Sequence, residues 1–359
     1  MSQVTEEDVS NLARGNWRYI LQALCPTLEA AVNSKNHVDC PIHGGKSDFR
    51  ICRKKGDEIG MSYCTCGTRN GYQLLMTLNG WSFPETLKAI ADLLNLSTVS
   101  PADMDRLRAQ EAARQFDLKH RRQAEANEIA EYRNRVWAKA VPLSHISAKP
   151  ARLYLNNRGL DYQLVSNHVR FHPAMAVRTE DGSISNFIPC LLSRVYACNG
   201  RPLTIHRTYI TDDGHKASIG KAKRLMPVPD LWADLTGRVI PVTEACPQVG
   251  ILGLAEGLET ALAASQATGI PVWSTVSDGP MKNFIPPAWV TKLVIYADRD
   301  RSRAGILAAK QLKSALETNG WPGQIQIELP PFPIPDGKKG LDWCDILNTY
   351  GVGMFNSVA

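Results

Sequence analysis

The pattern of hydrophobic and polar positions divides the first half of the chain into three segments of different expected structure. Residues 5–35 carry apolar side chains at helical spacing, which predicts one or two helices. Residues 37–98 contain a cysteine cluster, then an apolar run and a further helix. Residues 102–140 contain neither Gly nor Pro and are dense in charge of both signs, which predicts one long exposed helix.

The second half of the chain changes from a strand-rich pattern to a regular alternation. Short apolar runs between turn residues, such as Phe187–Leu192 and Leu203–Ile210, predict strands within residues 146–245. From residue 249 onward, runs of strand length alternate with helical patterns, which is typical of a parallel α/β sheet. The predicted strands are 249–255, 271–276, 291–297 and 324–329, and the predicted helices are 257–268, 281–285 and 302–318.

The positive charge of the chain is concentrated in the strand-rich central block. The 359 residues include 41 Lys and Arg against 35 Asp and Glu, a net charge of +6. Twelve basic and six acidic residues lie between Ile146 and Trp232, so this block accounts for the whole excess. Because 44% of the residues are hydrophobic, the chain can form real cores, and its length suggests two or three domains.

No feature of the sequence points to a membrane. No apolar run approaches the roughly 20 residues of a membrane-spanning helix. The first ten residues, MSQVTEEDVS, are polar and acidic, which is not the pattern of a secretory signal peptide. We therefore expect a cytoplasmic protein without a membrane partner.

Four of the nine cysteines gather between Cys40 and Cys66, and such clustering indicates metal binding rather than disulfides in a reducing compartment. Cys40 and His43 form one pair, and Cys64 and Cys66 form a second pair after twenty intervening residues. Zinc takes four nitrogen or sulfur ligands, and a site with four protein ligands is structural. One residue separates the second pair where two are usual, so Cys52 is a substitute ligand, and four unrelated buried cysteines are the alternative interpretation.

Three carboxylates directly follow predicted parallel strands. Glu256 comes after the strand at 249–255, and Asp298 and Asp300 come after the strand at 291–297. Binding sites in parallel sheets lie beyond the carboxyl ends of the strands, so we expect these side chains on one edge. Carboxylate ligands at this density suit Mg²⁺ or Mn²⁺, which assist reactions at phosphate.

Three further acids have two interpretations each. Glu259 either joins this site or is a favourable acid in the first turn of a helix, and the second interpretation is favoured. Asp342 and Asp345 either cap the following helix or assist the metal, and the pattern does not decide between these roles.

Six cations of the central block are candidate contacts to nucleic acid or nucleotide phosphates: Arg194, Arg207, Lys216, Lys221, Lys223 and Arg224. The aromatic residues that could stack on bases nearby are Tyr154, Tyr196, Tyr209 and His206. Each of these residues taken singly is more often an ordinary surface or core residue, so the inference depends on the whole block. Gly214–Lys221 fails the phosphate-loop pattern in its glycine spacing and in Ala222, so no ATPase is implied.

Several of these segments are similar to parts of Toprim-type DNA primases. Gly15–Trp17, Cys40–Arg50 and Gly71–Leu96 resemble the N-terminal zinc-ribbon domain of plasmid, satellite-phage and DnaG-type primases. The segments that resemble the first Toprim motif, the D-x-D motif and the acidic stretch after it are Ala255–Ala261, Tyr296–Asp300 and Gly340–Asp345.

The segment before Toprim resembles primases of mobile elements. Tyr154–Leu160 and His206–Lys216 carry this similarity, and only the 102–140 helix lies outside the resemblance. Thr260 stands where DnaG-type enzymes carry an acid, which favours the plasmid, phage or mobile-element branch. The order of zinc ribbon, basic segment and Toprim is more specific than any single motif.

The resemblance implies an α+β multidomain fold with a zinc-ribbon β domain, a long helical linker and a mixed α/β catalytic core. That core ends in a Toprim subdomain with a Rossmann-like parallel sheet. The expected domains are 1–36 (helices), 37–98 (zinc ribbon), 99–145 (linker), 146–245 (basic subdomain) and 246–359 (Toprim).

The resemblance also implies a function, namely synthesis of short RNA primers on single-stranded DNA from NTPs, beside a separate helicase. Glu256, Asp298 and Asp300 would hold Mg²⁺ or Mn²⁺ with help from Asp342 or Asp345, and zinc would be structural. Two alternatives remain open. One is a Toprim-type metal-dependent nuclease, and the other is a non-catalytic factor that binds single-stranded DNA or loads other proteins onto it.

Overall fold

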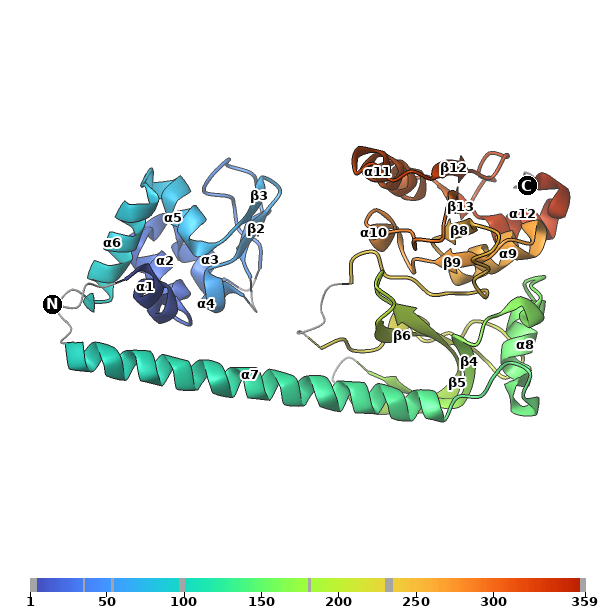
Figure 1. The fold of residues 1–359 in the computed structure, drawn as a ribbon, viewed down its shortest axis with the longest axis horizontal. Helices are drawn as coiled ribbons and strands as arrows, with labels where there is room; N and C mark the ends of the chain where they lie inside the picture. The colour runs from blue at the N-terminus through green and yellow to red at the C-terminus, as the bar shows by residue number, and fades with distance from the viewer. Residues whose placement is uncertain are drawn as a thin grey trace. The chain divides into compact units, whose positions relative to one another are not determined.

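The computed structural model describes residues 5–34, 36–52, 55–96, 101–179, 182–229 and 235–355 (Figure 1). The chain divides into two compact units, Met1–Arg121 and Arg122–Ala359. Helix α7 (Pro101–Ala138) runs across this division and confirms the long helix predicted for residues 102–140. None of the helices in these described ranges is long and apolar enough to cross a membrane.

The first unit packs short helices around Trp17, beside a three-stranded antiparallel sheet. The helices are α1 (Glu6–Ala13), α2 (Trp17–Leu24), η1 (Pro26–Leu28), α3 (Glu29–Asn33), α4 (Gly56–Ile59), α5 (Gly71–Asn79) and α6 (Phe83–Leu93), and the strands are β1 (Arg50–Ile51), β2 (Ser62–Cys64) and β3 (Gly67–Arg69). Trp17 is buried, and a Cβ atom on Gly71 would lie 2.2 Å from its ring. A glycine at position 71 therefore lets α5 begin directly against the indole.

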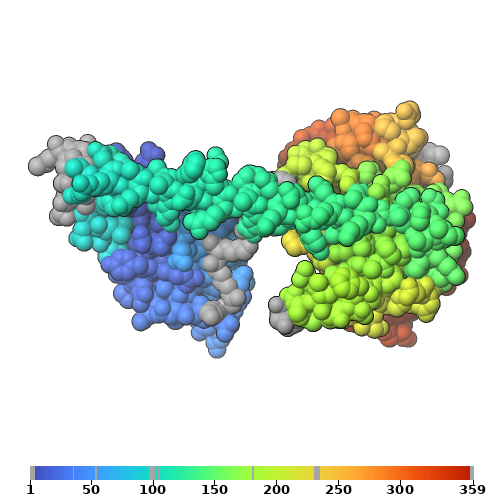
Figure 2. Space-filling model, turned by 90° about the horizontal axis from the view of Figure 1, so that it is seen from below, coloured from blue at the N-terminus to red at the C-terminus, as the bar shows by residue number. Residues whose placement is uncertain are grey.

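An ion pair attaches the start of α7 to the first unit. Arg108 donates from Nε and Nη2 to the two carboxylate oxygens of Asp8, at 2.6 and 2.8 Å. Asp8 is buried and also forms the capping box of α1 with Thr5. The Arg108 guanidinium holds the pKa of the Asp8 carboxyl well below its usual range. The middle of α7 is largely exposed (Figure 2).

The end of α7 packs on a four-stranded antiparallel sheet in the second unit. The strands, in sheet order, are β4 (Val169–Arg178), β5 (Ile184–Tyr196), β6 (Pro202–Tyr209) and β7 (Lys223–Leu225). Trp137 of α7 shares a buried cluster with Leu192 and Ile205. The alternate positions Leu191 and Val195 belong to a different cluster on the opposite face.

That opposite face packs on α8 (Lys149–Asn156) and on residues of the C-terminal half of the unit. The sequence pattern indicated only strands and turns here, so it missed α8. The helix is short and Pro150 lies in its first turn, which suits a helix start but resembles a turn signal in sequence. Two 3₁₀ turns, η3 (Ile146–Ala148) and η4 (Tyr162–Leu164), flank it.

The remaining residues form a parallel sheet with helices, as predicted. The strands, in sheet order, are β12 (Gln324–Glu328), β10 (Lys292–Tyr296), β8 (Ile251–Ala255) and β9 (Val272–Ser274), and the helices are α9 (Leu258–Thr268), α10 (Asp278–Met281), α11 (Ala304–Thr318), α12 (Trp343–Tyr350) and η6 (Val352–Met354). A small antiparallel pair, β11 (Arg299–Asp300) with β13 (Gly340–Leu341), lies beside it. The helix predicted at 281–285 begins three residues earlier in the structure, at Asp278 with Ser277 as its N-cap residue.

We expect Arg108→Leu to lower the free energy of unfolding of the protein by about 1–3 kcal/mol, because Asp8 stays buried without its cation. Since the folded-state pKa of Asp8 is depressed, the ion pair stabilises the fold above about pH 4, and this contribution is lost as the pH falls further. Urea denaturation at pH 7 and at pH 3 measures both effects.

The matched control is Arg106→Leu on the same helix. Arg106 pairs with Asp103 at 3.4 Å, but the two side chains are 80% and 56% exposed. Such surface pairs contribute little, so this variant should unfold within about 0.5 kcal/mol of the parent. Equal losses in both variants would contradict the anchoring role of Asp8 and Arg108.

Candidate active site and metal centre

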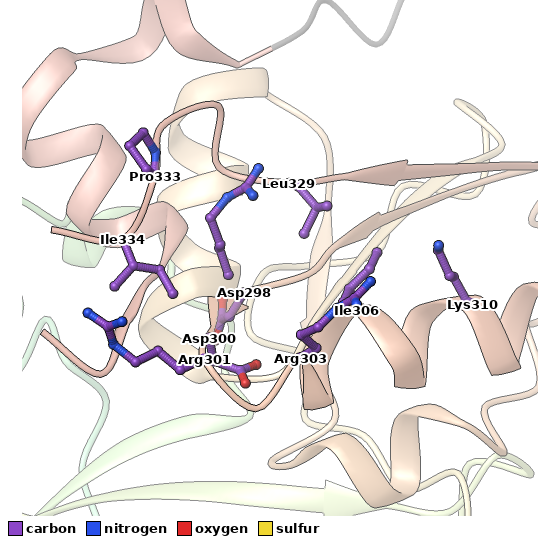
Figure 3. Close-up of a pocket in the computed structure, with 10 residues that line it drawn as sticks. Asp298, Asp300, Arg301, Arg303, Ile306, Lys310, Leu329, Pro333 and Ile334 are labelled. Atoms are coloured by element: carbon purple, nitrogen blue, oxygen red, sulfur yellow. The ribbon is translucent and has the colours of Figure 1, made fainter.

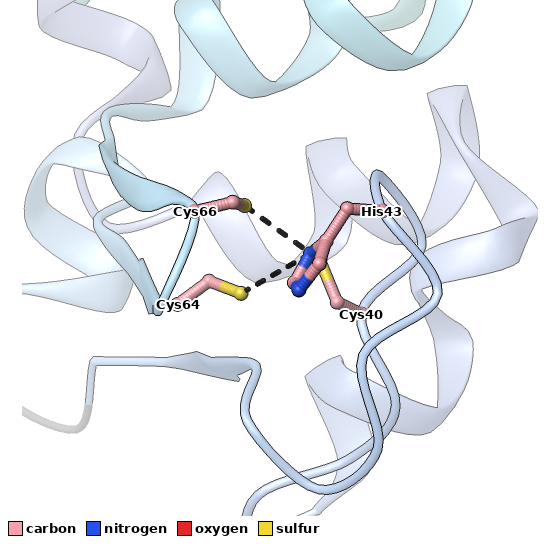
Figure 4. Close-up of side chains that lie close together, drawn as sticks. All are labelled: Cys40, His43, Cys64 and Cys66. Atoms are coloured by element: carbon pink, nitrogen blue, oxygen red, sulfur yellow. Dashed lines mark hydrogen bonds between the residues drawn. The ribbon is translucent and has the colours of Figure 1, made fainter.

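Two ligand pairs of the first unit, one Cys–His and one Cys–Cys, meet in one four-residue group (Figure 4). The ligand atoms of Cys40, His43, Cys64 and Cys66 all lie within 4.8 Å of one another. Cys40 Sγ lies 3.9 Å from Cys66 Sγ, and Cys64 Sγ lies 3.7 Å from His43 Nδ1. Tetrahedral zinc with bonds of about 2.0–2.3 Å separates its ligands by about 3.5–3.8 Å, so these four side chains fit zinc.

Asp48 orients the histidine of this group. Its Oδ2 atom lies 3.1 Å from His43 Nε2 and accepts a 2.6 Å hydrogen bond from the Thr65 hydroxyl. A carboxylate on the second ring nitrogen fixes the tautomer that presents Nδ1 to a metal. A Cβ atom on Gly45 would lie 2.4 Å from both partners, so only glycine leaves room for this contact. Sequence analysis missed Asp48, although a carboxylate five residues after a ligand histidine was a usable signal.

Cys52, the substitute ligand, lies outside this group. Its backbone N–H donates to the Met61 carbonyl at 2.8 Å, and its Sγ accepts from the Lys55 N–H at 3.4 Å. The one-residue spacing of Cys64 and Cys66 is accommodated because both lie at the tight β2–β3 turn, where Cys64 pairs with Gly67. Gly67 has φ of +124°, a conformation that glycine adopts without strain.

The predicted carboxylates of the second unit lie where the parallel strands end. Glu256 directly follows β8, and Asp298 follows β10 by one residue beyond Ala297. The two strands are hydrogen-bonded neighbours in parallel register, with Tyr296 opposite Ala255. Adjacent strand ends therefore carry these two acids to the same edge of the sheet.

Asp298 has the most unfavourable charge environment of this edge. Its Oδ1 atom is buried and has no hydrogen-bond partner among the described residues. Burial, and then the carboxylates of Asp342 and Glu256, raise the pKa of Asp298 to about 8. Burial and nearby acids also raise the pKa of Glu256. A buried carboxylate without a partner is costly, and a divalent cation would compensate both its charge and its unused oxygen. The oxygen ligands of these acids suit Mg²⁺ or Mn²⁺ chemically, whereas among the described residues only the Cys/His group has four ligand atoms within 4.8 Å of one another.

Asp300 uses its carboxylate differently from Asp298. It accepts hydrogen bonds from the Ser302 hydroxyl and from the backbone N–H groups of Ala304 and Gly305, at 3.2 and 3.1 Å for the two amides. These bonds lower the pKa of Asp300 although burial opposes ionisation. Asp300 thereby caps α11, and with Asp298 it lines a second cavity of about 580 Å³ (Figure 3).

Asp342 and Asp345 cap α12 and also face the acidic edge. Asp342 Oδ1 accepts from the Asp345 N–H at 2.8 Å, and Asp345 Oδ2 accepts from the Asp342 N–H at 3.4 Å. Burial and the Asp345 charge raise the pKa of Asp342, although the Asp345 N–H opposes this shift. Capping and cavity lining therefore coexist in the same two side chains.

Glu259 is paired with the basic sheet. Lys223 Nζ lies 2.7 Å from Glu259 Oε2, and the Tyr154 hydroxyl donates to Oε1. Burial alone would raise the pKa of Glu259, but Lys223 and Tyr154 together lower it to about 2. Glu259 is therefore ionised at neutral pH, and Lys223 neutralises its charge.

One cavity of about 700 Å³ collects these acids and part of the basic block. Its charged lining residues are Glu256, Glu259, Asp298, Asp342, Asp345, Arg158, Lys216 and Lys223. Lys216 reaches it from the turn at Gly214, whose φ is +80° and where a Cβ atom would lie 2.5 Å from Leu153. Close approach of this turn to α8 therefore positions Lys216.

The other four predicted cations lie elsewhere. Arg194 stacks on Trp137 with 4.3 Å between the guanidinium carbon and the ring centre, on the α7 face of the sheet. Arg207 donates to the Tyr209 hydroxyl and to the Leu225 carbonyl. Lys221 is exposed, and Arg224 donates to the backbone carbonyls of Lys221 and Arg178. The alternation of the strands thus divides the basic block between two faces.

The aromatic residues nearby do not present rings for stacking as a group. Tyr154 and Tyr209 are fully buried, and His206 is 7% exposed. Tyr196 binds His168 Nδ1 through its hydroxyl at 2.9 Å. The interpretation of Tyr154, Tyr209 and His206 as stacking residues was therefore wrong, because Tyr154 is buried on helix α8 and both faces of strand β6, which carries His206 and Tyr209, are covered.

Sequence analysis missed two features of the large cavity. Arg158 lines it and lies over the Tyr154 ring at 4.0 Å. Val276 lines it with φ of +72°, a conformation that β-branched residues rarely adopt, and such strain gathers at functional sites. The charge of Arg158 next to Tyr154-Leu-Asn-Asn was a usable signal, whereas no sequence pattern indicates the strain at Val276.

Comparisons with known proteins identify part of the second unit. Residues 251–352 match the family model of the Toprim domain, and residues 127–231 match a domain of unknown function, DUF7146. The chain therefore contains a Toprim domain, and the acidic edge described above lies within it. No curated protein matches the chain.

Solved structures of DnaG primases are similar to the chain at low identity. The DnaG primase catalytic domain bound to ssDNA is 16% identical, with a TM-score of 0.44 over 64% of this chain and 77% of that one. The E. coli primase catalytic core is 17% identical, with a TM-score of 0.40 over 65% and 77%. The zinc-binding and RNA polymerase domains of the Aquifex aeolicus primase are 15% identical, with a TM-score of 0.39 over 96% and 83%.

We expect Cys66→Ser to remove most of the zinc that copurifies with the protein, because it deletes one of four ligands. Cys52→Ser is the matched control and should keep the full zinc content. Metal analysis by mass spectrometry on both purified variants decides the ligand set. Zinc loss in the Cys52 variant with retention in the Cys66 variant would assign the fourth ligand to Cys52.

We expect Asp298→Asn to raise the melting temperature in EDTA at pH 9 by about 2–6 °C, because the Asp298 carboxyl, whose pKa is raised to about 8, is ionised there and repelled by its neighbours. Added Mg²⁺ should stabilise the parent more than this variant. Glu317→Gln, on an acid that is 59% exposed, should change neither value. A lower melting temperature for Asp298→Asn in EDTA would contradict the crowded-carboxylate description.

Proposed function

We propose that this protein is a DNA primase that synthesises short RNA primers on single-stranded DNA by metal-dependent nucleotidyl transfer. The observation that carries the proposal is the 700 Å³ cavity, in which the carboxylates of a Toprim domain face Lys216 and Lys223. Acids and lysines that line one cavity suit a reaction between phosphate-bearing substrates.

The proposed roles follow from the charge state of each group. Glu256 and Asp298, with Asp342 or Asp345, would hold the divalent cation, since burial and neighbouring carboxylates raise the pKa of Glu256, Asp298 and Asp342. Such a cation neutralises phosphate oxygens while a 3′-hydroxyl attacks the α-phosphorus. Asp300 would support this group from its position as the cap of α11.

Lys216 and Lys223 would bind the phosphates of the incoming NTP. Lys223 is held by Glu259 at 2.7 Å, which fixes its ammonium group at the cavity wall. Lys216 is exposed and has room to follow the substrate. Arg158, flat against the Tyr154 ring, presents a third cation to the same space. The remaining cations, Arg194, Arg207, Lys221 and Arg224, are proposed to contact the template.

The zinc group has a structural role in this proposal. Zinc held by Cys40, His43, Cys64 and Cys66 would fix the β2–β3 turn, and the small β domain around it would help select where synthesis starts. Helix α7 would set the reach of that domain. The proposal includes a separate replicative helicase as a partner and a host plasmid, phage or other mobile element.

Primer synthesis on random single-stranded DNA, with NTPs and Mg²⁺, tests the proposal. The parent should make short oligoribonucleotides, and EDTA should abolish them. Asp298→Ala should reduce synthesis by at least about 100-fold, because it removes a central ligand from the proposed metal site. Binding to the template in EDTA should stay within about twofold. Glu317→Ala is the matched control and should synthesise normally.

Two results would overturn the proposal. Shortening of the template without new oligoribonucleotides would identify a nuclease. Tight binding in EDTA without synthesis under any condition would identify a non-catalytic binding factor. Undiminished synthesis by Asp298→Ala would remove this carboxylate from the active site.

A further inference from the structure

A second cavity, of about 580 Å³, lies beside Asp298 and Asp300 (Figure 3). Asp298 lines both cavities. The charged groups around the second cavity are Asp298, Asp300, Arg299, Arg301, Arg303 and Lys310. The proposed functions assigned above use none of these four cations.

Two of the arginines are oriented by backbone carbonyls. Arg299 donates from Nε to the Pro330 carbonyl at 3.0 Å, and Arg301 donates from Nε to the Lys338 carbonyl at 3.1 Å. Carbonyl partners orient a guanidinium group without neutralising its charge. The loop between β12 and β13 therefore holds two full positive charges beside the acidic edge.

The other two cations lie on α11 around an apolar residue. Arg303 precedes the helix as its N-cap, and Ile306 and Lys310 follow at helical spacing on the same side of it (Figure 3). Arg303 has φ of +62°, a conformation that residues other than glycine rarely adopt. The side chains of Arg303 and Lys310 are exposed, whereas Lys313 of the same helix pairs with Glu317.

The acids of this cavity do not cancel its positive charge. Asp300 already accepts hydrogen bonds from Ser302, Ala304 and Gly305. Asp298 belongs to the cluster of acids that is proposed to bind the divalent cation. Four cations against two acids still leave an excess of positive charge, which suits a polyanion.

We propose that this second cavity binds the sugar-phosphate backbone of a single-stranded nucleic acid as it passes the active site. The apolar lining favours a strand over a free triphosphate, because Ile306, Leu329, Pro333 and Ile334 lie among the cations. A nucleoside triphosphate presents one sugar and one base beside a single cluster of phosphates, whereas a strand presents sugars and bases between successive phosphates, and this cavity is lined by cations and apolar side chains together. Because Asp298 lines both cavities, a strand held here runs next to the proposed metal ligands.

This inference rests on the proposed function, since it assigns a path to the strand on which that function acts. Binding of a fluorescent oligodeoxynucleotide in EDTA, without NTPs, tests it independently of synthesis. The test variants are Arg303→Asn, which keeps a residue that tolerates positive φ, and Lys310→Gln. Each should weaken binding about fivefold at 0.1 M salt, and together they should reduce the salt slope by about 1.4.

The matched control is Lys313→Gln, with the same loss of charge on the same helix, and it should bind like the parent. Unchanged affinity and salt slope in the double variant would overturn the inference while leaving the proposed function intact. An increased KM for NTPs with unchanged strand binding would also overturn it, in favour of a triphosphate site. A parent protein that binds no single strand would instead refute the proposed function.

Discussion

The electrostatic environment of Asp298 is the constraint on which the acidic edge of the second unit depends. Its carboxylate is buried, has an unpaired oxygen and faces the negative charges of Asp342 and Glu256. Such a group destabilises the folded state by itself, so the surrounding framework has to hold it in place. The apolar parallel strands supply that framework, because Val294 and Ile295 just before it are fully buried. This repulsion between carboxylates, which a positive charge would relieve, makes the edge suitable for a metal ion.

The positions of the chief acids could be predicted because they depend on one simple rule. Parallel strands end at a common edge, so an apolar run followed by an acid places that acid without any knowledge of side-chain packing. Glu256 and Asp298 satisfy this rule, and the parallel register of β8 and β10 brings them together. The zinc group was predictable for a similar reason, since paired ligands on tight turns need only local chain geometry. The match to the Toprim family model confirms the Toprim assignment, and the observed sheets and helices confirm the mixed α/β fold.

Other features escaped prediction because they depend on contacts between distant segments or on strand phase. The carboxylate of Asp300 follows a strand as Asp298 does, yet it turns to the N–H groups of α11, a choice that no spacing reveals. Asp48 acts on His43 through a loop conformation that Gly45 permits. The basic block looked uniform in sequence, but neighbouring cations point to opposite sides of a sheet. The roles of the individual site residues remain predictions that the proposed experiments address.

The division of the basic block has a consequence for how this protein can change. Lys223 and Arg224 are adjacent, yet the first pairs with Glu259 in the cavity and the second binds the Arg178 carbonyl. A one-residue slip of β7 against β6 would exchange the two faces and place the arginine where the lysine belongs. Insertions and deletions in this strand are therefore far more damaging than substitutions. Substitutions at these two neighbouring positions can therefore arise independently, provided that the number of residues in the strand stays constant.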